Sequence, residues 1–306
     1  MFFISLHRMK RLSEEIVSFL EENGFTCRHK VRDDQDILYI PLTDEKTERL
    51  IVPWEIDTES IGSSRSHSDR ILHIVRQIKQ SYGHYPLIIT QDRWSARKEM
   101  MKARILAHLE KFVPAYARNC EVRRIDKKTA EYFLEENHNY GYSACRYKYG
   151  LFLKRHTGHI AENKKAEGVE NCGLDTLVAV ATFSNARKWT KGEKVIRSYE
   201  WTRYASLPGM RISGGMGKLL KAFIKEVSPD DIMTYADLEW SEGDVYSKLG
   251  FELEGTKERI SFLIDPVRWG RSAIKDQEDE NIEIRQLYLT NFGSNKFRMK
   301  LTDYQK

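Results

Sequence analysis

The fold is decided by one stretch, Ser198–Phe251, which reads SYEWTRYASLPGMRISGGMGKLLKAFIKEVSPDDIMTYADLEWSEGDVYSKLGF. Alternating aromatic and charged residues in Ser198–Ala205 predict a half-buried strand. The glycine-rich turn Ser213–Lys218 follows, and apolar residues then recur at helical spacing over Leu219–Ile224. The apolar run Ile232–Ala236 predicts a second, buried strand. We therefore expect a strand, a glycine turn, a helix and another strand, in that order.

The position of the glycine turn, between a strand and a helix, suits a phosphate group. Glycines let backbone N–H groups approach an anion, and the helix N-terminus adds a favourable dipole. Gly217 falls where the first helical turn should be, although glycine in a helix costs roughly 1 kcal/mol relative to alanine. The alternative interpretation is a turn that needs glycines for its own geometry and binds nothing.

The segment that closes the stretch, Gly243–Phe251, contains the pattern Tyr-x-x-Leu-Gly-Phe. With the order that precedes it, this pattern resembles the GNAT acetyltransferase superfamily. The resemblance implies an α/β fold with a GNAT-like mixed central sheet and flanking helices, and acetyl-CoA or another acyl-CoA as cofactor. The family has Arg or Gln three residues before its Gly-x-Gly, whereas this chain has Ile212 there and Arg211 one residue earlier.

The resemblance also implies two catalytic roles. Glu200 would accept the proton of the substrate amine, and Tyr246 would protonate the departing CoA thiolate. The plainer alternatives are a surface glutamate beside an arginine and a packed aromatic ring. Strict strand alternation would place Tyr199, Trp201 and Arg203 on one face and Glu200, Thr202 and Tyr204 on the other. On that basis Glu200 and Arg203 are not expected to share a face.

The remaining site residues follow from the same resemblance. Those expected to contact the cofactor lie at the end of the first strand, along which pantetheine would run, and in the glycine turn: Arg203, Tyr204, Ala205, Arg211, Ser213, Gly214, Gly215, Met216, Gly217 and Lys218. Expected to contact the substrate are His138, whose pKa lies near neutrality, and Trp240 and Ser241, which follow a strand end. The histidine has an alternative role in the helix dipole, and the tryptophan in the core.

These residues predict an acyl-CoA-dependent N-acyltransferase, an N-acetyltransferase in the simplest case, that acts on an unidentified small-molecule or macromolecular amine. One alternative is a phage-derived, nucleic-acid-binding or DNA-modifying GNAT-like module. Another is a scaffold without catalysis. The segments Phe133–Gly141 and Tyr235–Ser241 resemble GNAT-like modules of phage proteins, some similar to the DNA-modification protein Mom and some fused to homing-type nucleases.

The N-terminal third reads as a separate domain. The length of 306 residues allows two domains, and we expect a small α/β domain over residues 1–115 and a GNAT-like domain over 116–306. Within the first, Ser60–Ser68 reads as a loop of small polar residues. In the second, Ile284–Leu289 and Lys296–Leu301 are predicted to pair across a turn-rich segment.

The segment Gln91–Ile105 resembles the end of a nuclease module that is similar to the very-short-patch repair endonucleases. Such an enzyme needs carboxylates to hold Mg²⁺, and the candidates are Asp36, Glu55, Asp57 and Asp92. The expected lysine two residues after the acid is missing, since Glu55 is followed by Ile56 and Asp57. We therefore predict a degenerate domain that neither holds a metal ion nor cuts DNA.

Composition sets the remaining limits. The chain is 41% hydrophobic and 31% charged, with a formal net charge of +5. No apolar run approaches the roughly 20 residues that span a membrane, and no signal-peptide region is evident. The four cysteines are scattered without a Cys-x-x-Cys pair, so the sequence predicts neither a zinc site nor a disulfide. A cytoplasmic protein without a membrane partner is expected.

The basic residues permit a nucleic-acid partner. Arginines and lysines interleave with aromatic residues near Arg93–Lys98, Arg118–Arg124 and Arg146–Lys148. Arginine neutralises phosphate and aromatic rings stack on bases, so such mixtures occur in nucleic-acid sites. The alternative is that these are ordinary solvated charges and core aromatics.

Overall fold

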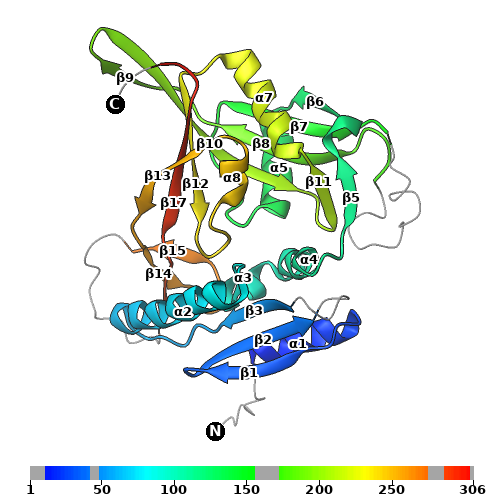
Figure 1. The fold of residues 1–306 in the computed structure, drawn as a ribbon, viewed down its shortest axis with the longest axis vertical. Helices are drawn as coiled ribbons and strands as arrows, with labels where there is room; N and C mark the ends of the chain where they lie inside the picture. The colour runs from blue at the N-terminus through cyan, green and yellow to red at the C-terminus, as the bar shows by residue number, and fades with distance from the viewer. Residues whose placement is uncertain (1–10, 42–47, 156–171, 275–285, 304–306) are drawn as a thin grey trace. The chain divides into compact units, whose positions relative to one another are not determined.

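The computed structural model describes residues 11–41, 48–155, 172–274 and 286–303, and the chain forms two compact units (Figure 1). Unit 1 comprises residues 1–109 and 258–293, and unit 2 comprises 110–257 and 294–306. This division differs from the single boundary expected at residue 115, because a late segment of the chain folds with unit 1. The contacts that join this segment to the rest of unit 1, such as the hydrogen bond from the Tyr288 N–H to the Thr58 carbonyl at 2.9 Å, are distant in sequence, and local patterns do not reveal them.

Unit 1 contains a four-stranded sheet of order β1-β2-β3-β4 and a three-stranded sheet of order β15-β14-β16. The first three strands are joined by antiparallel pairs, whereas β3 and β4 run parallel and are connected through the long helix α2. The elements of this unit are α1 (Leu12–Glu22), β1 (Arg28–Arg32), β2 (Gln35–Pro41), β3 (Glu48–Trp54), α2 (Ile61–Tyr82), β4 (Leu87–Thr90), α3 (Gln91–Ala96), α4 (Lys98–His108), β14 (Ser261–Ile264), β15 (Arg271–Ala273) and β16 (Leu287–Thr290).

Helix α2 begins earlier than expected, so the prediction of a loop at Ser60–Ser68 is wrong. Ser60 is the N-cap, and its side chain accepts a hydrogen bond from the Ser63 backbone N–H at 3.1 Å. Ser64 and Ser68 are buried on the inner face of the helix, where the Ser64 hydroxyl is 2.7 Å from that of Thr290. A serine-rich helical turn is stable here because the hydroxyls cap the helix and meet polar partners.

Unit 2 is built on an eight-stranded mixed sheet. The strands follow the order β13-β17-β12-β10-β8-β7-β6, with β9 paired to β10 off this path. Its elements are β5 (Val113–Tyr116), the 3-10 turn η1 (Ala117–Asn119), β6 (Cys120–Arg124), α5 (Lys127–Asn137), β7 (Tyr147–Leu153), β8 (Leu177–Phe183), β9 (Arg187–Lys191), β10 (Lys194–Ser206), β11 (Met210–Ser213), α7 (Gly215–Val227), β12 (Asp231–Asp237), α8 (Asp244–Lys248), β13 (Glu252–Lys257) and β17 (Ser294–Lys300). The predicted fold class, an α/β fold with a mixed central sheet and flanking helices, is confirmed.

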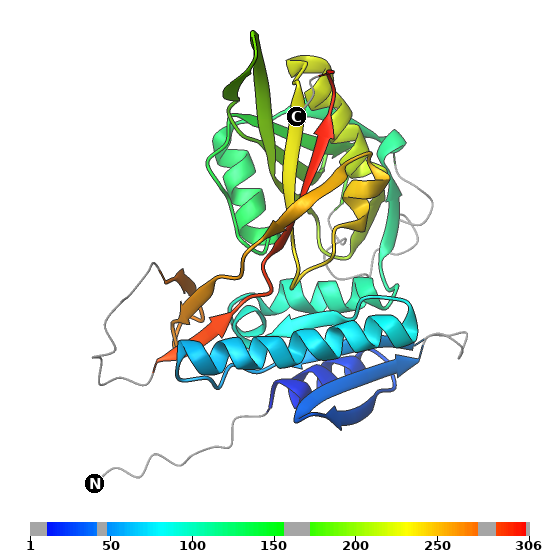
Figure 2. The ribbon, with the colours of Figure 1, turned by 60° about the vertical axis from the view of Figure 1, so that its left-hand side comes forward.

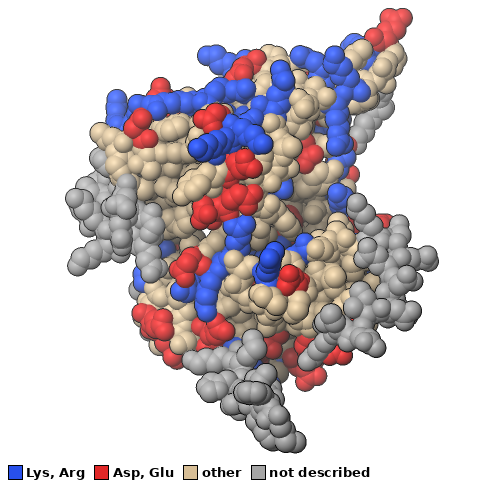
Figure 3. Space-filling model, turned by 180° about the vertical axis from the view of Figure 1, so that it is seen from behind, with Lys and Arg blue, Asp and Glu red and all other residues tan. Residues whose placement is uncertain are grey.

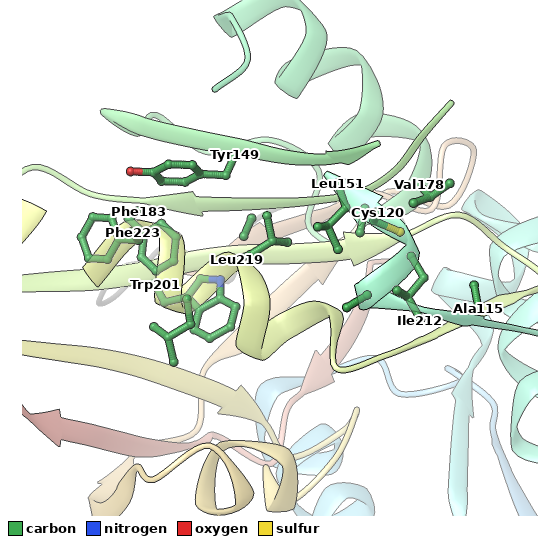
Figure 4. Close-up of a cluster of buried hydrophobic side chains, with 14 of the residues drawn as sticks. Ala115, Cys120, Tyr149, Leu151, Val178, Phe183, Trp201, Ile212, Leu219 and Phe223 are labelled. Carbon is green, nitrogen blue, oxygen red and sulfur yellow. The ribbon is translucent and has the colours of Figure 1, made fainter. Parts of the chain in front are cut away.

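The two faces of this sheet are covered by different helices. Helix α7 contributes Leu219, Leu220 and Phe223 to the larger core, whereas α5 contributes Ala130, Phe133 and Leu134 to a core on Val180 and Ala205. The Phe223 ring stacks on that of Phe183 with centroids 3.9 Å apart (Figure 4). The α7 face is therefore the densely aromatic one.

The last strands do not pair as predicted. Strand β16 pairs with β14 in unit 1, and β17 pairs with β12 and β13 in unit 2. The expectation that Ile284–Leu289 pairs with Lys296–Leu301 is therefore wrong. Both segments read as strands, but Gly293, with φ of 80°, passes the chain from one unit to the other instead of closing a hairpin.

Candidate functional site

Two neighbouring strands of unit 2 separate in the middle of its sheet. Strand β10 runs to Ser206 and β12 to Asp237, yet they pair only from Ser198 opposite Asp231 to Glu200 opposite Met233. Beyond Glu200, the Thr234 hydroxyl donates to the Trp201 carbonyl at 3.1 Å. A side-chain hydroxyl thus replaces the backbone N–H that would bond to this carbonyl if the two strands stayed paired. Since β8 and β17 occupy the outer edges of these two strands, the edges that face each other are left without strand partners.

A bulge in β10 lies at the same point. Trp201 stands opposite Phe183, and Arg203 stands opposite the adjacent Thr182, so Thr202 is an extra residue in the strand. A bulge of this kind shifts the alternation of side chains by one position. Bulges are common beside active sites, where they redirect a side chain.

The bulge overturns the predicted faces of β10. Trp201 and Tyr204 both lie on the α7 face, with rings 6.3 Å apart, whereas Ala205 belongs to the α5 face. Arg203, two residues before Ala205, is therefore on the same face as Glu200, and the two charges interact. Burial lowers the pKa of Arg203 and the neighbouring Glu200 opposes that effect. The expectation that these residues lie on opposite faces is wrong because it assumed unbroken alternation.

Glu200 has a fixed backbone and an available carboxylate. Its N–H donates to the Ser184 hydroxyl and its carbonyl accepts from the Ser184 N–H, both at 2.9 Å. Among the residues that the structure describes, its carboxylate has no hydrogen bond or ion pair, and the residue is half-buried. Ser184 is a site residue that the sequence did not indicate, because it follows a different strand.

The glycine turn forms the N-terminus of α7 as expected. Gly214 adopts φ of 76°, in the left-handed region that favours glycine, and no side chain caps the helix. The next three residues, Gly215, Met216 and Gly217, form the first turn, and the first intrahelical bond is from the Lys218 N–H to the Gly214 carbonyl at 3.0 Å. The N–H groups of the first turn therefore lack helical partners. Ser213, at the end of β11, is exposed.

The two glycines of the first turn also have a packing role. A Cβ at Gly215 would lie 3.1 Å from the Tyr204 hydroxyl and 3.2 Å from Ile212, and one at Gly217 would lie 3.2 Å from Leu249. Both glycines thus allow α7 to approach its neighbours closely. The phenol of Tyr204 is buried, which raises its pKa.

The two basic residues predicted beside the turn have other contacts. Lys218 donates through Nζ to the carbonyls of Ala117 at 2.9 Å and Cys120 at 2.5 Å. Its ammonium therefore satisfies the carbonyls at the start and at the C-cap of η1. For this reason Lys218 is not counted among the residues that could bind a phosphate. Arg211 is exposed on β11, with its guanidinium 5.2 Å from the Phe112 ring centre.

Tyr246 lies in α8 beneath the point where the strands separate. Its ring packs 6.0 Å from Trp201, 5.8 Å from Phe251 and 5.5 Å from Phe297. Burial raises the pKa of Tyr246, and a hydrogen bond with Thr234 partly offsets that rise. Although the residue is half-exposed overall, its hydroxyl is buried next to Thr234, whose side chain links β12 to β10.

The three predicted substrate residues lie close to one another around Asp237, at the end of β12. The backbone N–H groups of Trp240 and Ser241 donate to the Asp237 carbonyl at 2.8 and 2.9 Å. Tyr140 donates through its hydroxyl to the Asp237 carboxylate at 2.7 Å, and through its N–H to His138 Nδ1 at 3.1 Å.

The same loop is attached to β10. Arg203 Nε donates to the Gly141 carbonyl at 3.1 Å, so the turn after α5 is held by both diverging strands. This attachment of the turn could not be predicted from the sequence, because Tyr140 and Asp237 are distant in the chain.

The candidate carboxylates of unit 1 make separate contacts with different partners. Within the described ranges no group of three or more His, Cys, Asp or Glu residues is arranged to hold a metal ion. Asp36, Glu55 and Asp57 line a cavity of about 780 Å³. Asp36 lies 2.8 Å from His29, Glu55 accepts the Leu12 N–H at 2.9 Å, and Asp57 lies 3.7 Å from His67.

The fourth candidate, Asp92, is buried and bound by Arg271 at 2.5 Å. The arginine comes from the segment that returns to unit 1, and it occupies both carboxylate oxygens. This carboxylate therefore already has a cation. The four cysteines, Cys27, Cys120, Cys145 and Cys172, are free thiols.

Most basic residues of the three predicted segments already have partners. Arg93 is buried, and Lys98 pairs with Glu15 at 2.6 Å. Arg123 pairs with Asp175 at 2.6 Å, and the Arg124 guanidinium lies 5.0 Å from the Tyr149 ring centre. Over the described parts of the chain, no helix combines the length and the apolar character needed to cross a bilayer.

No protein-family model and no curated protein matches the chain. Several solved structures resemble its fold. A probable N-acyltransferase from Enterococcus faecalis V583 matches 47% of this chain and 34% of its own length, with 13% identity and a TM-score of 0.31. A GNAT-family acetyltransferase from Bacillus anthracis matches 60% of this chain and 95% of its own, with 13% identity and a TM-score of 0.29.

A third similar structure is the toxin AtaT bound to the C-terminus of its antitoxin and acetyl-CoA, which matches 56% of this chain and 93% of its own, with 11% identity and a TM-score of 0.25. The present chain thus spans about a third of the Enterococcus protein and nearly all of the other two. The first of these neighbours is described as a probable N-acyltransferase and the second as an acetyltransferase, and the third binds acetyl-CoA. At such scores the likeness gives no support to a function, which must come from the residues themselves.

Proposed function

We propose that unit 2 is an acyl-CoA-dependent N-acyltransferase that acts on an amine. The observation that carries this proposal is the separation of β10 and β12 after Glu200. Backbone N–H and C=O groups inside a sheet are almost always paired. An unpaired edge in the centre of a sheet is therefore a prepared site for an extended ligand with amide groups, which binds as an added strand does.

The pantetheine arm of CoA is such a ligand. It would run beside Arg203, Tyr204 and Ala205, whose other edge is occupied by β8. The N–H groups of Gly215, Met216 and Gly217, at the uncapped N-terminus of α7, would receive the pyrophosphate. The chain thus offers a strand edge and an anion-binding helix end in sequence order, and both fit acyl-CoA. Ser213 and Arg211 lie beside the same turn.

The bound acyl-CoA supplies an activated thioester for attack by the amine. Glu200 is suited to accept the proton of that amine, because its backbone is held by Ser184 while its carboxylate, which interacts with the Arg203 charge, makes no hydrogen bond or ion pair with a described residue. Tyr246 keeps a protonated hydroxyl, since burial raises its pKa, and a protonated phenol can donate to the leaving thiolate. His138, Trp240 and Ser241 lie around Asp237 and would position the acceptor.

Calorimetry with acetyl-CoA and acetyl-pantetheine tests the cofactor site. Met216→Pro removes one first-turn N–H at a position where a helix tolerates proline, and the preceding glycine limits the steric conflict. Met216→Ala loses the same side chain but keeps the N–H, so it is the matched control. Loss of one charged hydrogen bond should weaken acetyl-CoA binding roughly 10- to 100-fold in Met216→Pro relative to Met216→Ala.

Acetyl-pantetheine, which lacks the pyrophosphate, should bind both variants equally. Wild-type protein that binds no acetyl-CoA, or equal acetyl-CoA affinities for the two variants, would contradict this assignment. With an acceptor in hand, Glu200→Gln should lower kcat on the order of 10²- to 10⁴-fold, and Tyr246→Phe should lower it without weakening acetyl-CoA binding.

A further inference from the structure

The hairpin formed by β9 and the first half of β10 extends beyond the rest of the unit 2 sheet (Figures 1 and 2). Its described side chains are mostly exposed, among them Arg187, Lys188, Trp189 and Lys194. Strand β10 continues from this hairpin to Glu200 and the separation of the strands. Because these side chains are exposed, they do not serve to pack a core.

The register of the hairpin places like charges opposite each other. Arg197 stands opposite Lys188. Like charges directly opposite in an antiparallel pair are destabilising. Of these two residues, Arg197 has an ion pair, to Asp230 at 3.5 Å. A ribbon with this register is stabilised when an external anion neutralises it.

Three exposed cations of the ribbon have no internal counter-charge. The side chains of Arg187, Lys188 and Lys194 make no hydrogen bond or ion pair with any residue that the structure describes. By contrast, Lys98, Arg123 and Lys154 are all ion-paired. Figure 3 shows lysine and arginine side chains along the upper part of the face in view, on unit 2, with aspartate and glutamate side chains among them. The free cations of the ribbon are thus available to a polyanion.

The ribbon also offers an aromatic surface. Trp189 is 37% exposed and stands opposite Ile196 in the hairpin register. Alternation puts Arg187 on the same face of β9 as Trp189, and Lys194 on the same face as Ile196. One face therefore carries two cations around an indole, and Lys188 lies on the opposite face. We propose that the indole face of the ribbon binds single-stranded nucleic acid, with Arg187 and Lys194 on phosphates and Trp189 stacked on an unpaired base.

The chemistry favours nucleic acid over an acidic protein. A carboxylate-rich protein surface would need cations alone, whereas single strands are bound by a combination of phosphate contacts and aromatic stacking. Duplex DNA would use the same cations but would leave the indole without an unpaired base. The proposal concerns an interaction surface and does not depend on the acyltransferase assignment.

The test is fluorescence anisotropy of the full chain with a labelled single-stranded oligonucleotide, and with its duplex, between 50 and 200 mM salt. The double variant Arg187→Ala/Lys194→Ala removes the proposed phosphate contacts. The matched control, Lys221→Ala/Lys225→Ala, removes two exposed lysines from α7. Each phosphate contact contributes about 0.7 to the salt slope for single strands, so the double variant should lower the slope by about 1.4 and the control should not.

Trp189→Ala should weaken binding to the single strand roughly 10-fold and leave the salt slope and the duplex affinity unchanged. Absence of binding at 50 mM salt would overturn the proposal, as would equal losses in the double variant and its control. Poly-glutamate that competes as well as the oligonucleotide would point to a general polyanion surface and would also overturn it. Tighter binding to duplex than to single strand would refute the role given to Trp189.

Discussion

Replacing Arg271 with methionine should be among the most damaging single changes in unit 1. The Arg271 side chain is 9% exposed and that of Asp92 is 3% exposed. Arg271 donates to both carboxylate oxygens of Asp92, at 2.5 and 3.1 Å, and to the Thr90 hydroxyl at 3.2 Å. Burial raises the pKa of Asp92, but Arg271, with smaller effects of Arg93 and Thr90, outweighs burial and the pKa is lowered. The carboxylate is therefore charged, and Arg271 is its main partner.

Removal of one member of a buried ion pair costs about 3–5 kcal/mol, because the other charge stays buried without compensation. We expect a loss of this size for Arg271→Met. The double variant Asp92→Asn/Arg271→Met should recover most of it, since the carboxylate charge is then also absent. Arg259→Met is the matched control, because Arg259 joins the same returning segment to Asp69 through an exposed pair and should cost less than about 1 kcal/mol.

Urea unfolding followed by tryptophan fluorescence measures these differences, since Trp54 and Trp94 are both buried in unit 1. Because two units unfold, hydrogen exchange of the β4 and α3 amides should accompany the fluorescence and identify where stability is lost. A cost for Arg271→Met no larger than that for Arg259→Met would refute the reasoning. So would a double variant as unstable as the sum of its single changes.

Three further predictions concern stability and activity. Phe223→Ala should destabilise unit 2 by about 3–5 kcal/mol, as expected for a fully buried ring stacked on Phe183; thermal melts against the exposed Tyr132→Ala check this. Burial lowers the pKa of His108 from 6.5 to about 3. The unfolded chain therefore takes up a proton first, and the free energy of unfolding falls by up to about 1.4 kcal/mol per pH unit as the pH falls from 6.5 towards 3. His108→Gln should make this free energy, measured by urea unfolding, less dependent on pH over that range. We expect no Mg²⁺- or Mn²⁺-dependent cleavage of plasmid DNA, and cleavage that Asp57→Ala abolishes would contradict this.

The order of elements in Ser198–Phe251 could be predicted because each depends on local signals. The glycine turn, the apolar stripe of α7 and the buried run of β12 are patterns of neighbouring residues. The faces of β10 could not be predicted, because one extra residue at Thr202 is compatible with the same alternation and only the register with β8 reveals it. The hairpin of β9 was missed for a similar reason, since its residues are exposed and show no apolar period.

The candidate site was predictable in part. Glu200, Tyr246 and the first turn of α7 lie where the strands separate, but the contacts that fix them come from elsewhere in the chain. Ser184 holds the Glu200 backbone, and Tyr140 links the turn after α5 to Asp237. Lys218, by contrast, donates to the Ala117 carbonyl in η1, a contact that no spacing in the sequence indicates. Whether these residues act as proposed stays a prediction.

The chain passes from unit 2 into unit 1 and back. This path constrains the order in which the two units can fold during synthesis on the ribosome. Strand β17 lies between β12 and β13 in the sheet, yet it is synthesised after residues 258–293. Arg271, which neutralises Asp92, emerges about 180 residues after its partner. A nascent chain that ends before Arg271 would therefore leave the Asp92 carboxylate uncompensated in unit 1, and one that ends before β17 would leave an unfilled position in the unit 2 sheet. Neither unit can complete its fold until this late part of the chain has been synthesised.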